Sequence, residues 1–338
     1  MKTPIRPPRA SERGVALVWF ALFLMMFLFF MALGIDMAKL AGAKTQLQNA
    51  ADAAALAAAS AVDPLSGQIN HSLAFVRARE TAQLNDAFIK SPEPVIIEMS
   101  DVVMLSQNRV QVTARRVGAT SVVTQMASVL GLPSLSVTAV AVAQPDTARG
   151  VQCIVPIGVN LRPGESFTPG CGNLYTLKMG PGSGQRGNYG FLALRDCPES
   201  PCHQGSTNPH QLACLISNGW CCGMDVGQTI PVAPGNKGPA IDGVGSLFDS
   251  DTDRREGICS QNYSGNGKRM ITVPIVSAFS NGASAPVTVQ GFATFFLRNK
   301  PSKTDGTITG EFTYATTAGL PGGHSSSGGV SYVVRLTR

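Results

Sequence analysis

Two patterns of hydrophobic and polar positions follow each other near the N-terminus, with no helix breaker between them. Residues 15–35 form an apolar run without charge or proline. A helix of this length covers about 30 Å, which is the hydrocarbon thickness of a bilayer. From Asp36 the chain becomes rich in alanine and glutamine, and Pro64 marks the expected end of the helix. The pattern predicts a single transmembrane helix (15–35) that continues into an amphipathic stalk helix (36–62).

The flanks of the apolar run predict how it is used. The run is longer than the roughly 7–15 residues of a secretory signal, and no turn follows it, so we interpret it as an anchor rather than a cleaved signal peptide. Basic residues outnumber Glu12, the one acid of the preceding segment. This balance predicts a cytoplasmic tail (1–14) and a single pass through the bacterial inner membrane, with the remaining domains in the periplasm.

The stalk carries apolar residues at alternating three- and four-residue steps, the spacing of a heptad seam. The seam consists of Leu40, Ala43, Leu47, Ala50, Ala54, Ala57 and Ala61. Another face carries a polar row, Lys44, Gln48 and Asp52. Alanine at seam positions lets helices approach closely. Two interpretations stay open: the seam docks on a helix of a partner, or it packs against the protein's own next domain.

Downstream patterns predict two domains. The first (63–143) is a small α+β domain beside the membrane. Its expected elements are helices within 65–90 and 121–130 and strands at 95–99, 109–113 and 134–143. Residues 144–150 are polar and are interpreted as a linker. The second domain (151–338) is expected to be mostly β. Its elements are strands at 153–159, 176–179, 269–276, 287–297 and 330–336 and a helix at 211–219.

All cysteines fall in the second domain. They are Cys153, Cys171, Cys197, Cys202, Cys214, Cys221, Cys222 and Cys259. An even number confined to one extracytoplasmic domain is typical of disulfides formed in an oxidising compartment. The pairing cannot be read from the sequence. A local Cys197–Cys202 loop is plausible, and Cys221 and Cys222 are expected to pair elsewhere because a vicinal bridge is strained.

Three motifs invite a chemical interpretation. Cys197, Cys202 and His203 with the Cys221–Cys222 pair do not have standard zinc spacing, so disulfides are favoured. Residues 249–253 alternate aspartate like a calcium loop, but Arg254 stands where glycine is needed, so an acidic surface loop is favoured. The glycine-rich segment 180–187 lacks the Gly-Lys-Ser/Thr ending of a phosphate loop. No catalytic residue, cofactor or metal is therefore expected.

Composition narrows the function classes further. Charged residues make up 14% of the chain, and the net charge of +6 is not clustered. A nucleic-acid-binding surface would need a basic stripe, so nucleic acid is not expected as a partner.

The residues also carry a family resemblance. Glu12-Arg13-Gly14, the apolar run, Gly34-Ile35-Asp36 and the block 47–59 (LQNAADAAALAAA) together resemble the N-terminal segment of TadE/TadG-like Flp (Tad) pilus assembly proteins. Weaker similarity to TadG-type proteins continues at 187–192 and 289–293. Trp19 stands where prepilin peptidases need glutamate, and no von Willebrand A metal motif is present.

The resemblance implies a membrane-anchored, non-enzymatic component of Flp/Tad pilus assembly, with a role in pilus biogenesis and adhesion. Its expected partners are the membrane and other membrane-anchored pilin-like or Tad secretion-platform proteins, contacted through the N-terminal helix. One alternative is an anchored adhesin or cell-wall-binding protein outside pilus biogenesis. A second is an anchored periplasmic enzyme, against which stands the lack of a catalytic motif.

Overall fold

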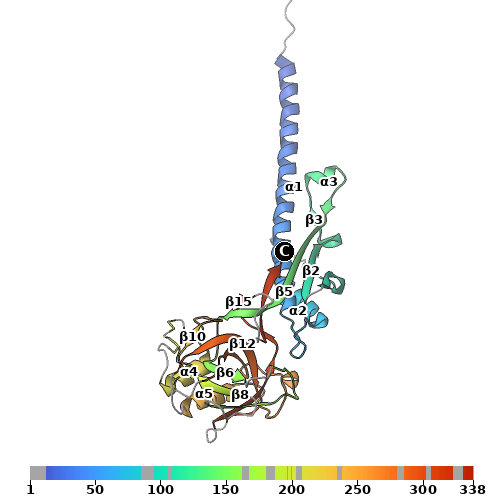
Figure 1. The fold of residues 1–338 in the computed structure, drawn as a ribbon. Coiled ribbons are helices and arrows are strands. Elements are labelled where there is room, and N and C mark those ends of the chain that lie inside the picture. Colours follow the sequence, from blue (N-terminus) through green and yellow to red (C-terminus); the bar gives the residue numbers. More distant parts are fainter. Residues whose placement is uncertain are drawn as a thin grey trace, which may run out of the picture.

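The computed structural model describes residues 13–84, 95–105, 108–161, 167–179, 187–195, 197–198, 200–202, 208–233, 238–279, 285–301, 306–322 and 330–337. One long helix, α1 (Arg13–Ala59), projects from a folded body (Figure 1). Its C-terminal half packs on the first domain, and a β-rich domain forms the far end of the body. The predicted cytoplasmic tail lies outside the described residues except at Arg13 and Gly14.

The first domain places a helix pair on one face of a sheet. Helix α2 (His71–Leu84) packs beside α1, and the strand order of the sheet is β1-β2-β5-β16-β14. These strands are β1 (Val102–Leu105), β2 (Arg109–Arg116), β5 (Val137–Val151), β16 (Ser331–Thr337) and β14 (Ala315–Thr316). Strands β9 (Met224–Asp225) and β15 (Gly319–Pro321) pair with the distal half of β5.

A smaller unit projects from the first domain between β2 and β5. It holds a two-stranded ladder, β3 (Val122–Val123) and β4 (Ser134–Leu135), joined through the short helix α3 (Met126–Val129). Single 3₁₀ turns lie at η1 (Met99–Asp101), η2 (Gly118–Thr120) and, in the second domain, η3 (Ser260–Asn262).

Small side chains bring α1 close to the sheet. Strand β2 alternates between half-buried and buried residues, and it pairs antiparallel with β5 so that Val112 lies opposite Ala141. The inward positions of β5 are alanines, and they meet the alanine-rich side of α1 in one cluster. Side chains of a strand return to the same face every two residues, and those of a helix every 3.6 residues. The apolar positions of β2, β5 and α1 follow these repeats, so each element has one apolar face to pack against the other.

The predicted linker 144–150 is wrong, because these residues form the second half of β5. Their polar side chains have partners: Asp146 accepts a hydrogen bond from Gln144 (2.7 Å) and pairs with Arg335 of β16. Gln144 and Asp146 are 4% and 1% exposed. The two domains are therefore joined by one continuous strand, and the C-terminal strand β16 belongs to the sheet of the first domain.

The second domain is built on a closed sheet. Its order is β12-β11-β6-β8-β7-β13, and β13 pairs back onto β12. The strands are β6 (Ile157–Leu161), β7 (Tyr175–Met179), β8 (Gly187–Phe191), β11 (Met270–Val276), β12 (Val287–Leu297) and β13 (Thr307–Thr313), with β10 (Thr229–Ile230) added to β12. Phe312 is fully buried, with ring centroids of Tyr175 and Phe295 at 4.8 and 5.0 Å.

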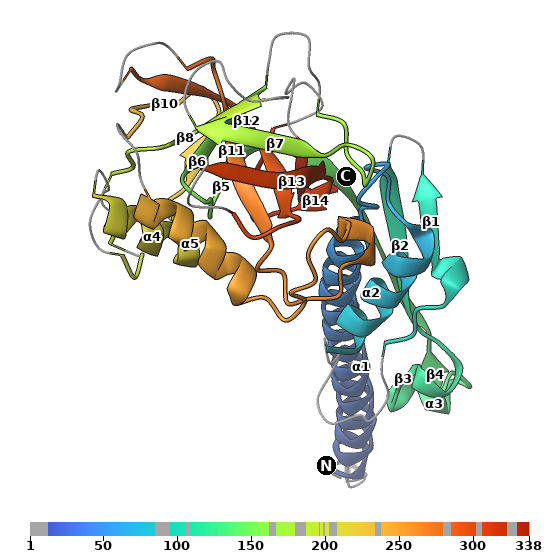
Figure 2. The same ribbon diagram turned by 90° about the horizontal axis from the view of Figure 1, so that it is seen from below.

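Two helices, α4 (Pro209–Asn218) and α5 (Gly238–Asp249), pack against each other and on this domain (Figure 2). Helix α4 confirms the helix expected at 211–219. Helix α5 was not expected, because its glycines disfavour a helix. At Gly243 a Cβ atom would lie 2.8 Å from the Cα of Ala213, so the close crossing of the two helices requires glycine there.

The fold class predicted from the sequence is confirmed: one long apolar helix, a small α+β layer and a mostly-β domain with disulfides. Local boundaries differ. The helix expected at 65–90 is α2 at 71–84, and the helix expected at 121–130 is shortened to α3 with β3 before it.

Candidate functional site

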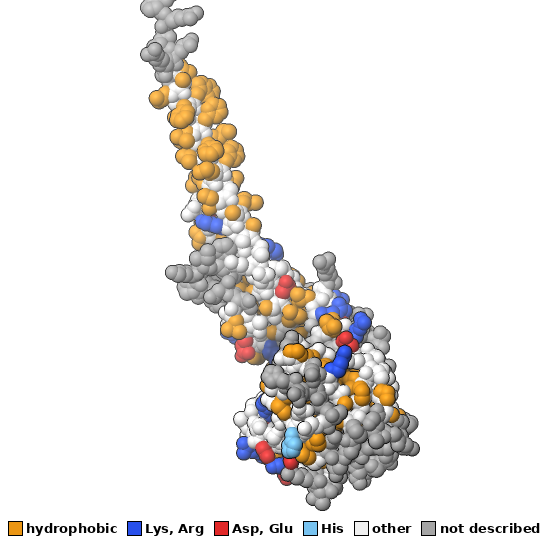
Figure 3. Space-filling model, turned by 90° about the vertical axis from the view of Figure 1, so that its left-hand side faces the viewer, with side chains coloured by type: hydrophobic (Ala, Val, Ile, Leu, Met, Phe, Trp, Pro, Cys, Tyr) orange, Lys and Arg blue, Asp and Glu red, His pale blue; other side chains and the backbone are white. Residues whose placement is uncertain are grey.

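The N-terminal half of α1 is exposed and apolar. Within the described residues, α1 is the one helix long and apolar enough to cross a membrane; its 18-residue window has a mean hydropathy of 2.7 and is 0% buried. Leu17 and Met25 are each 71% exposed. On the face that Figure 3 shows, hydrophobic side chains cover much of this part of the helix. Soluble proteins rarely expose so large an apolar surface, so the helix supports membrane anchoring.

Asp36 marks the end of the apolar run and is buried. Its carboxylate accepts hydrogen bonds from the backbone N–H groups of Gln125 (2.9 Å), Met126 (2.7 Å) and Ala127 (3.0 Å). These amides are the unpaired donors at the start of α3, and a carboxylate is a favourable partner for them. The amide bonds, that of Gln125 first, hold the pKa of Asp36 below its ordinary value, so it stays charged although it is 2% exposed.

The seam predicted as a partner-helix surface is mostly inside the protein, so the interpretation as a partner-docking seam is corrected. Of its residues, Ala43, Leu47, Ala50, Ala54 and Ala61 are at most 2% exposed and lie against the protein's own sheet and α2, while Leu40 and Ala57 are half-buried. The alternative of packing on its own domain is the one the structure supports. The heptad spacing could not distinguish docking on a partner's helix from packing on the protein's own domain, because a helix buries the same apolar stripe against a sheet as against another helix.

The polar row of the stalk also contacts the sheet. The Lys44 ammonium donates to the carbonyl oxygen of Thr138, and the Gln48 amide donates to that of Val140 at 3.1 Å. Both acceptors lie on β5 before the stretch that pairs with β16, whose register begins at Val142. These side chains therefore supply donors to carbonyls of β5 and fix the orientation of the stalk.

All eight cysteines are in disulfides. The bridges are Cys153–Cys221, Cys171–Cys259, Cys197–Cys222 and Cys202–Cys214. The disulfide framework is confirmed, and Cys221 and Cys222 pair elsewhere as expected. The local Cys197–Cys202 loop is wrong, because Cys202 bridges to Cys214 of α4, and Cys197 bridges to Cys222 in the segment between α4 and β9. Disulfide bonding also leaves these sulfurs unable to serve as zinc thiolates; His203 lies outside the described residues.

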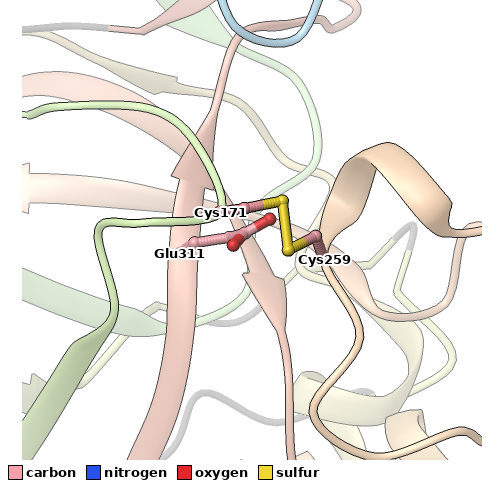
Figure 4. Close-up of side chains that lie close together, drawn as sticks. All are labelled: Cys171, Cys259 and Glu311. Atoms are coloured by element: carbon pink, nitrogen blue, oxygen red, sulfur yellow. A yellow bond between two sulfur atoms is a disulfide. The ribbon is translucent and has the colours of Figure 1, made fainter.

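Among the described residues, the Cys171–Cys259 bridge and Glu311 bring candidate metal-ligand atoms together (Figure 4). Their sulfur and carboxylate oxygen atoms lie within 4.8 Å of one another. Glu311 is 0% exposed; it accepts a hydrogen bond from the amide of Ser260 (2.6 Å) and lies 3.8 Å from Arg298. Because the sulfurs are bonded to each other, the arrangement is that of a bridge beside a charge-paired carboxylate.

The aspartate-rich segment 249–253 is folded around a buried arginine. The guanidinium of Arg269 is 0% exposed and lies over the rings of Phe248 (4.3 Å) and Phe296 (4.7 Å). It donates to backbone carbonyls, including that of Asp253 at 2.8 Å. Asp251 accepts from the amide of Arg269 at 3.0 Å.

The carboxylates of this segment are occupied by protein donors. Asp253 is paired with Arg255 at 2.6 Å, and that side chain is the main reason why the pKa of Asp253 lies far below its ordinary value. Asp251 also accepts from the hydroxyl of Tyr263, and burial is the main cause that raises the pKa of Tyr263 to about 12. Asp251 and Asp253 are buried, at 1% and 6% exposed, so these two residues do not belong to the acidic surface loop expected from the sequence. The glycine-rich segment 180–187 lies outside the described residues except Gly187.

Comparison with known proteins gives one match. The family model described as Flp pilus-assembly TadE/G-like matches residues 14–61. No curated protein and no solved structure matches the chain. The matched segment contains the exposed apolar half of α1, Asp36 and the helix face that is buried on the sheet, and it supports a role related to Flp/Tad pili. Residues 14–61 of this chain are therefore similar to the TadE/G-like Flp pilus-assembly family.

Proposed function

We propose that the protein is a membrane-anchored, non-enzymatic component of Flp/Tad pilus assembly that presents its disulfide-bonded domain outside the inner membrane. The observation that carries this proposal is the family match at 14–61, which coincides with the projecting apolar helix and its rigid attachment to the first domain. The helix is therefore both the anchor and a core element of the soluble part.

The distribution of charge and cysteine supports the proposed topology. Basic residues precede the span, which favours a cytoplasmic N-terminus. The disulfides all lie on the other side of the span, where a periplasmic location allows them to form. Tagging of the two ends with reporters that are active on one side of the membrane would check this orientation.

The surface available for partner helices is not the seam but the rest of α1. Along the stalk, exposed residues opposite the sheet are small or polar: Ala38, Ala41, Thr45 and Asn49. In the span every side is open, as the exposure of Leu17 and Met25 indicates. Small residues permit close helix contacts within membranes. We infer that pilin-like or secretion-platform helices dock on this outer face.

Site-specific photo-crosslinking in living cells tests the docking. A photoreactive residue at exposed Ala41 is expected to capture a membrane-anchored protein of the pilus machine, and the same residue at buried Ala54 is expected to give internal products. Crosslinks from Ala54 alone to another protein would contradict the docking face. Products from neither position would remove the helix as a partner surface.

Gene deletion separates assembly from simple adhesion. If the protein assembles pili, deletion is expected to abolish surface pili, and re-expression of the full chain is expected to restore them. Normal pili with loss of attachment would instead support the anchored adhesin or cell-wall-binding protein. Electron microscopy of the deletion strain beside an attachment assay provides both readouts.

A further inference from the structure

The unit that projects between β2 and β5 exposes an unusual number of apolar side chains. We call residues 121–135, with β3, α3 and β4, the tip. Its exposed apolar residues are Val123 (70%), Val129 (75%), Leu130 (62%) and Leu132 (51%). The chain has no charged residue from 117 to 145, so the whole tip lies within an uncharged stretch. An uncharged surface with exposed leucine and valine is suited to an apolar environment.

The position of the tip relative to the membrane helix is fixed by Asp36. The three hydrogen bonds from the start of α3 to this carboxylate attach the tip to the residue that directly follows the apolar run. Figure 1 shows α3 and β3 alongside α1, at the end of the first domain that points toward the span. The exposed side chains therefore lie at the height where α1 enters the bilayer.

The backbone of the tip is suited to an environment that is poor in water. The amide of Thr124 donates to the carbonyl of Pro133 at 3.0 Å. The turn after α3 is closed by hydrogen bonds from Leu130 and Leu132 to the carbonyl of Ala127, at 3.1 and 2.9 Å. Backbone N–H and C=O groups that are hydrogen-bonded within the protein lower the free-energy cost of moving the tip out of water.

We propose that the tip inserts its apolar side chains into the interfacial region of the leaflet that α1 leaves at Ile35, so that the protein contacts the bilayer at two places. This inference rests on the proposed membrane anchor and goes beyond it. The partner is lipid, because the tip is tied to the end of the span and because its surface is apolar without charge. A second contact beside the span prevents the body from tilting freely about α1.

Depth-dependent fluorescence quenching tests the proposal on the full chain reconstituted into phosphatidylcholine vesicles. Leu130→Cys, on the tip, and Leu320→Cys, on β15, carry the same environment-sensitive dye at positions that are 62% and 61% exposed. Met25→Cys, in the span, reports the anchor. Intact native disulfides are checked by mass before the measurement.

The expected result is a blue-shifted dye at Leu130 that is quenched by spin-labelled lipid several times more strongly than the dye at Leu320. Vesicles that contain phosphatidylglycerol are expected to give the same quenching, because the tip has no charge. Quenching of Leu130 by a water-soluble quencher to the level of Leu320, or protection from both quenchers, would overturn lipid contact. Absence of lipid quenching at Met25 would overturn the anchor as well, so the two failures are distinguishable.

A variant of the tether gives an independent check. Asp36→Ala removes the acceptor of the α3 amides and is expected to lower lipid quenching at Leu130 while the quenching at Met25 is unchanged. Thr45→Ala, at an exposed position of the same helix, is the control and is expected to change neither. Unaltered quenching at Leu130 in Asp36→Ala would contradict the positioning role of Asp36.

Discussion

The two soluble domains differ in the size of their buried side chains and in their disulfide content. In the first domain, α1 lies on the sheet mainly through alanine and valine. Among the described residues, the fully buried part of this cluster contains no aromatic side chain, and the half-buried Phe75 packs against it. In the second domain, the closed sheet surrounds Tyr175, Phe295 and Phe312, and the disulfides all lie in this part of the chain. In the first domain, small side chains therefore allow α1 to lie close to the sheet. In the second domain, large aromatic side chains fill the core and disulfides cross-link the chain.

The difference follows from what each domain is attached to. The first domain packs on a helix that continues into the apolar span, so its contact with α1 has to be close and of fixed register. The described part of the second domain instead fills the interior of a closed sheet with large rings. We expect the first domain to be sensitive to added volume and the second to be sensitive to lost volume and to reduction.

The largest effect is expected from removal of an aromatic ring in the second domain. Phe312→Ala deletes a fully buried side chain that contacts three other rings, and it should lower the free energy of unfolding by about 3–5 kcal/mol. Fluorescence of Trp220, in a background where Trp19 is replaced by phenylalanine, reports unfolding of this domain. The control Leu320→Ala, at an exposed position, should change stability little.

The next largest effect is expected from loss of a disulfide that joins residues far apart in the sequence. The Cys171–Cys259 bridge closes a separation of 88 residues, and replacement of both cysteines by serine should cost about 2–5 kcal/mol. The same Trp220 signal measures the loss. Hydrogen exchange in β2 should be nearly unchanged in this variant, because the bridge lies outside the first domain. Equal loss of protection in both domains would contradict independent stabilisation of the two domains.

Added volume should act on the first domain. Ala54→Leu places a larger side chain at a site that is 0% exposed between α1 and the sheet, and it should destabilise the domain by about 1–3 kcal/mol. Ala38→Leu, on an exposed face of the same helix, should be neutral within about 0.5 kcal/mol. Hydrogen exchange of β2 and β5 measures the difference, and a similar response to both variants would mean that the helix does not depend on close contact.

The smallest effect should be the response of the second domain to alkaline pH. The pKa of Tyr263 is raised from 10.0 to about 12, chiefly by burial and then by its hydrogen bond to Asp251. The unfolded chain loses this proton first, so stability should be complete below pH 10 and should decrease as the pH rises toward 12. Tyr263→Phe should flatten this part of the pH profile of unfolding; an unchanged profile would remove Tyr263 as its source.

The sequence alone determined the features that depend on local pattern. The apolar run of α1, the alternation of β2 and the confinement of cysteine to the second domain each follow from a short periodicity or from composition, so the fold class could be predicted. The family resemblance of 14–61 was likewise contained in consecutive residues.

Tertiary structure decided the features that depend on a distant partner. The heptad seam packs on the protein's own sheet and α2 rather than on a partner's helix. Residues 144–150 became strand because β16 and β15 return to pair with them, and Cys197 bonded to Cys222 rather than to Cys202. Asp36 became the cap of a helix about 90 residues away. A local pattern specifies which face of an element must be covered, but only the assembled chain supplies the surface that covers it.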